Sequence, residues 1–404
     1  MSSLTTMAIA TAVLCALGVD AAACPPGAGY GQSGTNNTTP ALTQPYYPAN
    51  AHCVEYTVPI SISYDRVNFN FSQWPDNYAL EQSWADFTTR PTASFPSIVN
   101  GTVHETADYT VAASFCTPRK PDGKEMTVIL ATHGIGPGRA HWNSAYSPDQ
   151  YNFVQYAVEA GYSVFFYDRV GCGESSKASG YVTQLSTGVA VLQQLAAAVR
   201  TGQYTSTVGK PSKLVLMGFS FGSYITHNTI AATPDIADAV VLTAFGANLA
   251  AGVNGNGLLR SFVPRVAALS NAQRFGLLDT GYLTWVDKYA LVENYFKYPY
   301  YDTNAVAYVE STKEAFSIGE FLTFATVPDT SSFTGAALAI TAETDYIVCD
   351  GYCPGVFDEP AKTYYKNAKP FVAYLQPEAS HHLNFHRNAT GAYEVITSFL
   401  DRTL

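Results

Sequence analysis

Residues 213–222 constrain the fold more than any other stretch of the chain. They form an apolar run that ends in a Gly-x-Ser-x-Gly sequence, Gly-Phe-Ser-Phe-Gly, and the residues that follow are typical of a helix. A strand that turns into a helix within one residue leaves no room for side chains two positions before and after the turn, which explains both glycines. The pattern therefore predicts a buried strand, a sharp turn with Ser220 at its apex, and a helix.

The predicted turn also offers a place for a nucleophile and for negative charge. Its backbone would hold the Ser220 hydroxyl out at the top of the sheet. The N–H of Phe221 would lie at the helix start, where backbone donors are unpaired and the helix dipole favours an anion. The flanking strand and helix favour a nucleophilic serine over a chance match in a surface turn.

Strands and helices alternate on both sides of this turn. Further apolar strands are expected at 126–132, 163–168, 239–244, 335–341 and 371–376, and helices at 149–160, 183–200, 357–367 and 391–404. Nearly continuous apolar strands separated by helices indicate a mostly parallel central sheet with helices on both faces. The predicted fold class is α/β.

Two strands precede this alternation, at 53–62 and 108–116. Residues 65–105 between them are expected to form a long insert with a helix around 77–87. The alternation stops at 246–335, where aromatic residues are frequent and no strand is evident. We expect this segment to be a mostly helical cap over the sheet, with a few of its rings lining a pocket.

The predicted domain organisation has four parts. Residues 1–23, an apolar run followed by a small-residue cleavage site, are expected to be a secretory signal peptide. Residues 24–118 would form an N-terminal extension with the first strands and the insert. The core would consist of 119–245 and 336–404, and the cap of 246–335.

Composition narrows the partners and the location. The net charge of -10 argues against nucleic acid and anionic membranes as partners, and no later segment is apolar enough for a stable membrane anchor. With the signal peptide, this favours a secreted glycoprotein. The candidate glycosylation sequons begin at Asn36, Asn37, Asn70, Asn100 and Asn388.

Six cysteines would remain after signal removal, an even number that suggests disulfides. If the strands at 53–62 and 108–116 pair antiparallel, Cys53 faces Cys116. Cys349 and Cys353 could close a small loop, which would leave Cys24 and Cys172 to pair with each other. No cysteine spacing resembles a zinc site, and no metal or organic cofactor is implied.

A serine nucleophile needs a base and a group that orients the base, and in parallel sheets such groups gather at the carboxyl ends of strands. Asp345 follows one predicted strand, and His381 and His382 follow the next. The chain order Ser, Asp, His resembles the α/β-hydrolase superfamily over about residues 120–404. The resemblance also rests on His-Gly at 133–134, Asp-Arg-Val-Gly-Cys-Gly-Glu-Ser at 168–175 and the loop at 380–386, which is similar to that of secreted fungal-type serine hydrolases.

The resemblance implies a role for each matching residue. It makes Ser220 the nucleophile, Asp345 the orienting carboxylate and His381 the base. The backbone N–H groups of Phe221 and Ile135 would form the oxyanion hole. Alternatives to the base and the carboxylate are His382, Asp350 and Glu343, whereas Asp168, Arg169, His133 and His386 are expected to be structural.

The sequence thus predicts a secreted serine hydrolase that cleaves a small, moderately apolar carboxylic ester through an acyl-enzyme on Ser220. One alternative is an amide or peptide hydrolase of the prolyl aminopeptidase-like branch. Such enzymes hold a free amine with carboxylates of the cap, for which the candidates are Glu293, Glu310, Glu314 and Glu320. Another alternative is a non-catalytic binding protein with a hydrolase fold, although no triad member is visibly missing.

Overall fold

An eight-stranded sheet lies at the centre of the computed structural model, which describes residues 45–89, 98–247, 260–324 and 326–404. Its strand order is β1-β2-β4-β3-β5-β6-β10-β11. Neighbours from β4 to β11 pair in parallel, and β2 pairs antiparallel with both β1 and β4. The strands are β1 (Ala51–Phe69), β2 (Val99–Pro118), β3 (Thr127–Thr132), β4 (Ser163–Tyr167), β5 (Lys213–Phe219), β6 (Ala239–Thr243), β10 (Ala336–Ala342) and β11 (Phe371–Gln376). The predicted fold class is confirmed.

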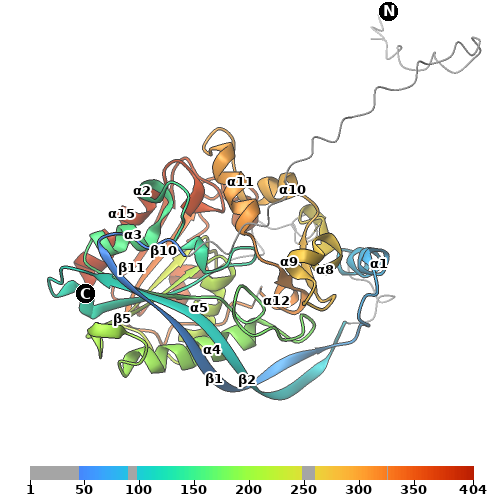
Figure 1. The fold of residues 1–404 in the computed structure, drawn as a ribbon, viewed down its shortest axis with the longest axis horizontal. Helices are drawn as coiled ribbons and strands as arrows, with labels where there is room; N and C mark the ends of the chain where they lie inside the picture. Colours follow the sequence, from blue (N-terminus) through green and yellow to red (C-terminus); the bar gives the residue numbers. More distant parts are fainter. Residues whose placement is uncertain (1–44, 90–97, 248–259, 325) are drawn as a thin grey trace, which may run out of the picture. The chain divides into compact units, whose positions relative to one another are not determined.

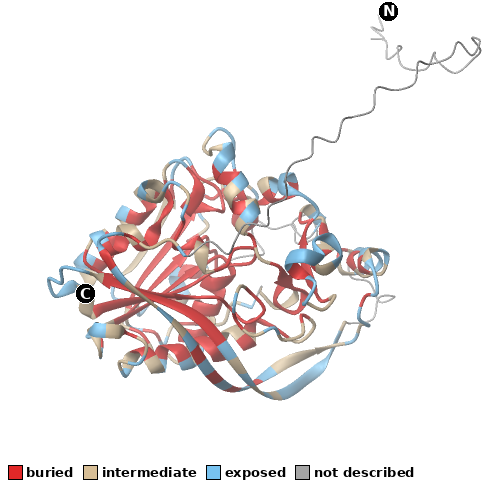
Figure 2. Ribbon diagram, in the orientation of Figure 1, coloured by how far each residue is buried: buried red, intermediate tan, exposed pale blue. Residues whose placement is uncertain are grey.

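Helices cover both faces of this sheet (Figure 1). On one face α4 (Leu185–Arg200) packs against α5 (Phe221–Ala232), and on the other α15 (Ala389–Thr403) packs against α3 (Phe153–Glu159). Every residue of β3, β4, β6 and β10 is therefore buried, which is why these strands are apolar throughout rather than alternating (Figure 2).

Two predicted helices differ in the structure. The helix expected at 149–160 is divided into α2 (Pro148–Tyr151) and α3, because Asn152 is extended and its side chain caps α3 by accepting a hydrogen bond from the Gln155 N–H at 2.7 Å. The helix expected at 357–367 is reduced to α14 (Ala361–Tyr364). Pro360 keeps the preceding residue out of the helical region, so a longer helix cannot form there.

The first two strands form a long twisted hairpin that extends beyond the predicted limits (Figure 1). Most of the expected insert at 65–105 is therefore either strand or α1 (Asn77–Phe87), which has the predicted bounds. The register places Cys53 opposite Cys116, and the two form the predicted disulfide. At the far end of the hairpin, the Asn77 side chain accepts a hydrogen bond from the Val266 N–H of the cap at 2.8 Å.

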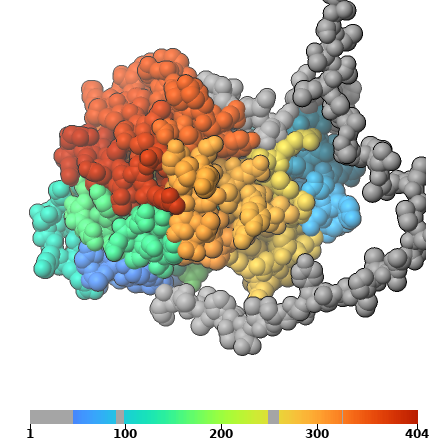
Figure 3. Space-filling view, turned by 90° about the horizontal axis from the view of Figure 1, so that it is seen from above, coloured from blue at the N-terminus to red at the C-terminus, as the bar shows by residue number. Residues whose placement is uncertain are grey.

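The cap is mostly helical, as expected, but it also contains strands that the sequence did not reveal. It contains a three-stranded antiparallel sheet of β7 (Pro264–Val266), β8 (Tyr282–Trp285) and β9 (Phe316–Ser317). Strands of two to four residues are too short for a two-residue periodicity to be visible in a sequence. The cap helices are α8 (Ala267–Ser270), α9 (Ala272–Phe275), α10 (Lys288–Tyr295), α11 (Thr303–Thr312) and α12 (Ile318–Thr323). Figure 3 shows the surface of the cap in yellow and orange, beside the red C-terminal part of the core.

Several sequence predictions concern residues outside the described ranges. These are the signal peptide at 1–23, Cys24, and the sequons at Asn36 and Asn37. Of the remaining sequons, Asn70 and Asn100 are exposed, whereas the Asn388 side chain is partly buried and donates a hydrogen bond to the Pro377 carbonyl at 3.3 Å. Within the described ranges, no helix combines the length and apolar character needed to cross a bilayer.

Candidate active site

The turn between β5 and α5 has the geometry that its sequence predicts. Ser220 has φ 51° and ψ −119°, a left-handed conformation that non-glycine residues rarely adopt. A Cβ atom on Gly222 would collide with the Thr132 carbonyl, and one on Gly218 would collide with the backbone of the first turn of α5. Both glycines are therefore required by the close contact of backbone segments around Ser220.

Ser220, His381 and Asp345 form a continuous chain of hydrogen bonds. The His381 Nε2 atom lies 2.7 Å from Ser220 Oγ, and its Nδ1 atom lies 2.8 Å from Asp345 Oδ2 and 3.0 Å from Oδ1. Both His381 and Asp345 are fully buried, and Ser220 is 8% exposed. In such an arrangement an imidazole can take the serine proton while the carboxylate holds the ring in the required tautomer.

Local structure fixes the Asp345 carboxylate. Asp345 caps α13 (Tyr346–Cys349), and its Oδ1 accepts a hydrogen bond from the Val348 N–H at 2.9 Å. The Cys349–Cys353 disulfide, expected from the sequence, closes the loop directly after this turn. The alternative carboxylates lie elsewhere: Asp350 is exposed, and Glu343 accepts a hydrogen bond from the backbone of Glu378.

The neighbouring histidines contact other groups. His382 Nε2 lies 3.0 Å from His141 Nδ1, so His382 is not directed at Ser220. Burial and the adjacent histidines hold the pKa of His382 well below its usual range, and burial with nearby His381 lowers the pKa of His141 to about 3. His386 accepts a hydrogen bond from the Ser380 N–H at 3.2 Å and also lies 3.0 Å from the His382 carbonyl, so it braces the loop that carries His381.

Two of the described residues, both with unpaired backbone amides, lie beside Ser220. Ile135 follows β3 and Phe221 begins α5, and both residues line the cavity beside Ser220. Among the described residues, neither of these two N–H groups has a hydrogen-bond partner. A Cβ on Gly134 would lie 2.8 Å from the Phe219 carbonyl oxygen, so glycine allows this loop to pass close to the serine turn. The arrangement can receive negative charge on a substrate oxygen.

The cavity beside Ser220 is small and largely apolar. Its volume is about 20 Å³, room for a single water molecule. Phe and Tyr rings supply most of its wall: Phe221, Tyr224, Phe262, Tyr295, Phe321 and Phe324. Four of these six rings come from the cap, as the aromatic content of 246–335 suggested.

Sequence reasoning missed two residues that contact this site. The Tyr295 hydroxyl donates a hydrogen bond to the Ile135 carbonyl at 2.6 Å, and its ring stacks on His381 with 5.1 Å between centroids. Arg169, expected to be part of a structural turn, donates a hydrogen bond to the Gly134 carbonyl at 3.1 Å. No spacing in the sequence links positions 295 or 169 to 134–135, so only the tertiary structure brings them together.

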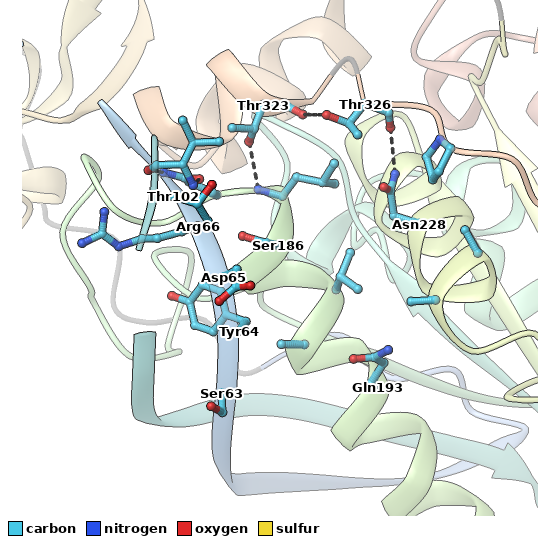
Figure 4. Close-up of a pocket in the computed structure, with 18 of the residues that line it drawn as sticks. Ser63, Tyr64, Asp65, Arg66, Thr102, Ser186, Gln193, Asn228, Thr323 and Thr326 are labelled. Carbon is cyan, nitrogen blue, oxygen red and sulfur yellow. Dashed lines mark hydrogen bonds between the residues drawn. The ribbon is translucent and has the colours of Figure 1, made fainter. Parts of the chain in front are cut away.

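Other candidate features lie away from this cavity or are inert. A groove of about 580 Å³ runs between β1, the start of α4, the end of α5 and the segment that contains Thr323, Thr326 and Asp329 (Figure 4). Ser220, His381 and Asp345 do not line this groove. Among the described residues Cys172 has no disulfide partner, and its predicted partner Cys24 lies outside them. Cys172 is buried, which raises the pKa of its thiol to about 12 and disfavours the thiolate near neutral pH. Within the described part of the chain, no group of three or more His, Cys, Asp or Glu residues is arranged to hold a metal ion.

Comparison with known proteins identifies the family. Residues 128–391, more than half of the chain, match the model of the Alpha/beta hydrolase family, and the protein belongs to this family. A search of curated proteins gave no match.

Solved structures with similar folds include several esterases and a lipase. A putative aryl esterase from Burkholderia cenocepacia has a TM-score of 0.50 and 15% identity, over 73% of this chain and 95% of that one. A thermophilic esterase from Thermogutta terrifontis has a TM-score of 0.48 and 14% identity, over 73% and 94% of the two chains. The Paleococcus ferrophilus monoacylglycerol lipase has a TM-score of 0.48 and 14% identity, over 73% and 99%. At these identities the likeness concerns the fold alone.

Proposed function

We propose that the protein is a serine hydrolase that cleaves carboxylic esters through an acyl-enzyme on Ser220. The observation that carries the proposal is the position of His381, which lies within hydrogen-bond distance of both Ser220 Oγ and Asp345. Free serine hydroxyls are poor nucleophiles near neutral pH, and this arrangement supplies the base that activates one.

In the first half of the reaction, the Ser220 oxygen attacks the ester carbonyl carbon as its proton passes to His381 Nε2. The carbonyl oxygen becomes an oxyanion, which accepts hydrogen bonds from the Ile135 and Phe221 N–H groups. The bond to the alcohol oxygen then breaks, the alcohol leaves with the proton from His381, and the acyl group remains on Ser220.

In the second half, a water molecule gives a proton to His381 and attacks the acyl-enzyme carbonyl. The oxyanion forms again in the same place, and its collapse releases the carboxylic acid while Ser220 recovers its proton. Asp345 holds the His381 ring in place and stabilises the imidazolium that forms twice in each cycle.

The surroundings of Ser220 favour an ester over the substrate of an aminopeptidase. An aminopeptidase needs free carboxylates near the serine to hold an amine. None of the four candidate carboxylates in the cap lines the cavity, and three of them are in ion pairs: Glu310 with Lys313, Glu314 with Arg274, and Glu320 with Arg169. The aromatic wall suits a moderately apolar acyl group.

The test is labelling by a fluorophosphonate probe, which reacts only with activated serines. The native protein should label and Ser220→Ala should not, and a nitrophenyl ester should be turned over faster than an aminoacyl anilide. Equal labelling of the two proteins would rule out the nucleophile. Faster turnover of the anilide would favour the amide hydrolase instead, and a native protein that neither labels nor turns over either substrate would favour the binding protein.

We also propose that the protein is secreted and glycosylated. The support is the apolar segment within 1–23 and the exposed sequons at Asn70 and Asn100. Protein recovered from the medium of a eukaryotic host should begin near residue 24 and lose mass on treatment with an N-glycosidase. An intact residue 1, or retention in the cell, would contradict the proposal.

A further inference from the structure

The peptide groups around Ile135 are held from two sides. The N–H of Ile135 and the carbonyl of Gly134 belong to the same peptide unit, and that carbonyl accepts the hydrogen bond from Arg169 at 3.1 Å. The next carbonyl along the chain, that of Ile135 itself, accepts the hydrogen bond from Tyr295 at 2.6 Å. The Gly134 carbonyl also lies 2.9 Å from the Nδ1 atom of its neighbour His133. Of the three side chains that hold the proposed oxyanion donor, Arg169 and Tyr295 are the two that come from distant parts of the chain.

The first of these side chains is connected to the cap. Arg169 is buried and forms an ion pair with Glu320 of α12. Glu320 is itself fixed, because its N–H donates to Ser317 Oγ at 3.0 Å in a capping box. The Arg169 guanidinium also lies 4.8 Å from the ring centroid of Phe221, so it contacts the residue of one proposed oxyanion donor and, through the Gly134 carbonyl, the peptide unit of the other.

The second side chain is part of the cap. Tyr295 is the last residue of α10 and is buried. Its backbone carbonyl accepts a hydrogen bond from the His382 N–H at 3.0 Å, next to the His381 ring on which its own ring stacks. Tyr295 therefore connects the loop of the proposed base to the loop of the proposed oxyanion hole.

We propose that Tyr295 and the Arg169–Glu320 pair are positioning residues, through which the cap holds the oxyanion hole in its working geometry. The inference rests on the proposed function. A hydrogen bond to the Gly134 carbonyl polarises the peptide unit and strengthens its N–H as a donor. Donors stabilise a transition state only when they are already aimed at the developing charge, so a free Gly134–Ile135 peptide would be a poorer catalyst.

The experiment compares two conservative substitutions with two matched controls. Tyr295→Phe removes one hydroxyl and keeps the stacked ring, and Glu320→Gln removes the charge and keeps the shape. Tyr282→Phe is the control for the first, because Tyr282 is also a buried cap tyrosine and donates to a backbone carbonyl, that of Ala178, at 2.9 Å. Glu310→Gln is the control for the second, since Glu310 is paired with Lys313 within the cap.

The measurements are kcat and KM for a nitrophenyl ester, and the inhibition constant of a trifluoromethyl ketone, which forms an oxyanion on a reactive serine. Displacement of a catalytic group by a distant change can cost up to about 100-fold, so we expect kcat to fall by about tenfold to 100-fold in Tyr295→Phe and Glu320→Gln. KM should change little, and the ketone should bind more weakly by a factor similar to the loss in kcat. The two controls should match the native protein.

All rates are expressed per site labelled by the fluorophosphonate probe, which removes the effect of misfolded protein. A merely structural role would lower the melting temperature while kcat per labelled site and ketone affinity stay native, and this result would overturn the inference. Should Glu320→Gln fail to fold, Tyr295→Phe decides the question. A native protein that neither labels nor turns over esters would instead overturn the proposed function, and the inference with it.

Discussion

The sheet core and the cap contribute different chemistry to the same cavity. The core supplies Ser220, Asp345 and His381, and all eight histidines of the chain lie outside residues 246–335. The cap supplies most of the aromatic wall, and its Glu320, which is buried but does not line the cavity, pairs with Arg169 of the core. Ser220, His381 and Asp345 thus all lie on the sheet core, whereas most of the groups that shape the cavity come from the insert.

This difference suggests how the two parts can vary independently. Strand ends of a parallel sheet fix side chains precisely because the strands are buried on both faces. An insert of short helices and strands can change the residues that line the cavity without altering that geometry. The exceptions are Tyr295, which contacts the Ile135 carbonyl and the His381 ring, and Glu320, which pairs with Arg169 of the core. Through these two residues the cap also contacts the groups around Ser220.

The largest expected effect concerns the two adjacent histidines of the core. His381→Gln should lower kcat by about 10⁶-fold, because the base that activates the serine is lost. His382→Gln should change kcat by less than about tenfold, since His382 contacts His141 rather than Ser220. Ester turnover by both variants, with melting temperatures as the control for folding, checks the prediction. Equal loss in both variants would contradict the assignment of the base.

Acid stability should distinguish the core from the cap. Burial lowers the pKa of His227 and of His386 to about 4, so between pH 4 and 6.5 the unfolded chain binds protons there that the folded protein does not. Stability is therefore lost as the pH falls through this window, by up to about 1.4 kcal/mol per pH unit for each such histidine. Urea unfolding at pH 7, 6 and 5 measures the slope.

A carboxylate of the cap, Glu314, should change stability with pH in the opposite direction. Burial raises the pKa of Glu314, so its contribution to stability is present at low pH and is lost as the pH rises through the folded-state pKa. Glu314→Gln should therefore steepen the loss of stability on acidification, and His227→Gln, which lies away from the cavity, should flatten it. If the free energy of unfolding has the same slope against pH in the native protein and in both variants, Glu314 and His227 are not the cause of the pH dependence.

The two disulfides of the described residues lie outside the cap, and we expect them to contribute differently to the free energy of unfolding and to turnover. The Cys53–Cys116 bond joins residues 63 positions apart and the Cys349–Cys353 bond joins residues 4 positions apart. From loop-closure entropy, replacing the first pair by serine should cost about 4 kcal/mol and replacing the second about 2 kcal/mol. The second replacement should lower kcat more, because it loosens the loop after Asp345. Urea midpoints and ester turnover test both expectations, and the reverse order in kcat would contradict them.

The smallest expected effect is on acyl preference. Phe324 belongs to the cap and lines the small cavity. Phe324→Ala should enlarge the cavity and raise the ratio of kcat/KM for an octanoyl ester over an acetyl ester by about tenfold, a typical value for added room in an apolar pocket. Tyr289→Ala, a substitution at an exposed cap residue, is the control. An unchanged ratio would place the acyl group elsewhere.

Local patterns in the sequence were enough for much of the core. The strand, turn and helix around Ser220 follow from two glycines that no larger residue could replace, and α1 has the predicted bounds because its residues and caps are local. The disulfide between Cys53 and Cys116 follows from antiparallel pairing alone. The sequence did not predict the break between α2 and α3 at Asn152. This break depends on one hydrogen bond, in which the Asn152 side chain caps α3 instead of continuing the helix.

Contacts between distant segments could not be predicted in this way. The sequence by itself determined the alternation of strands and helices and the order of Ser220, Asp345 and His381, because burial on both faces and sharp turns leave marks on consecutive residues. Only the tertiary structure decided that Tyr295 and Arg169 meet the 134–135 loop and that His381 rather than His382 faces the serine. Those contacts depend on how the insert folds back over the sheet, and no local periodicity records that path.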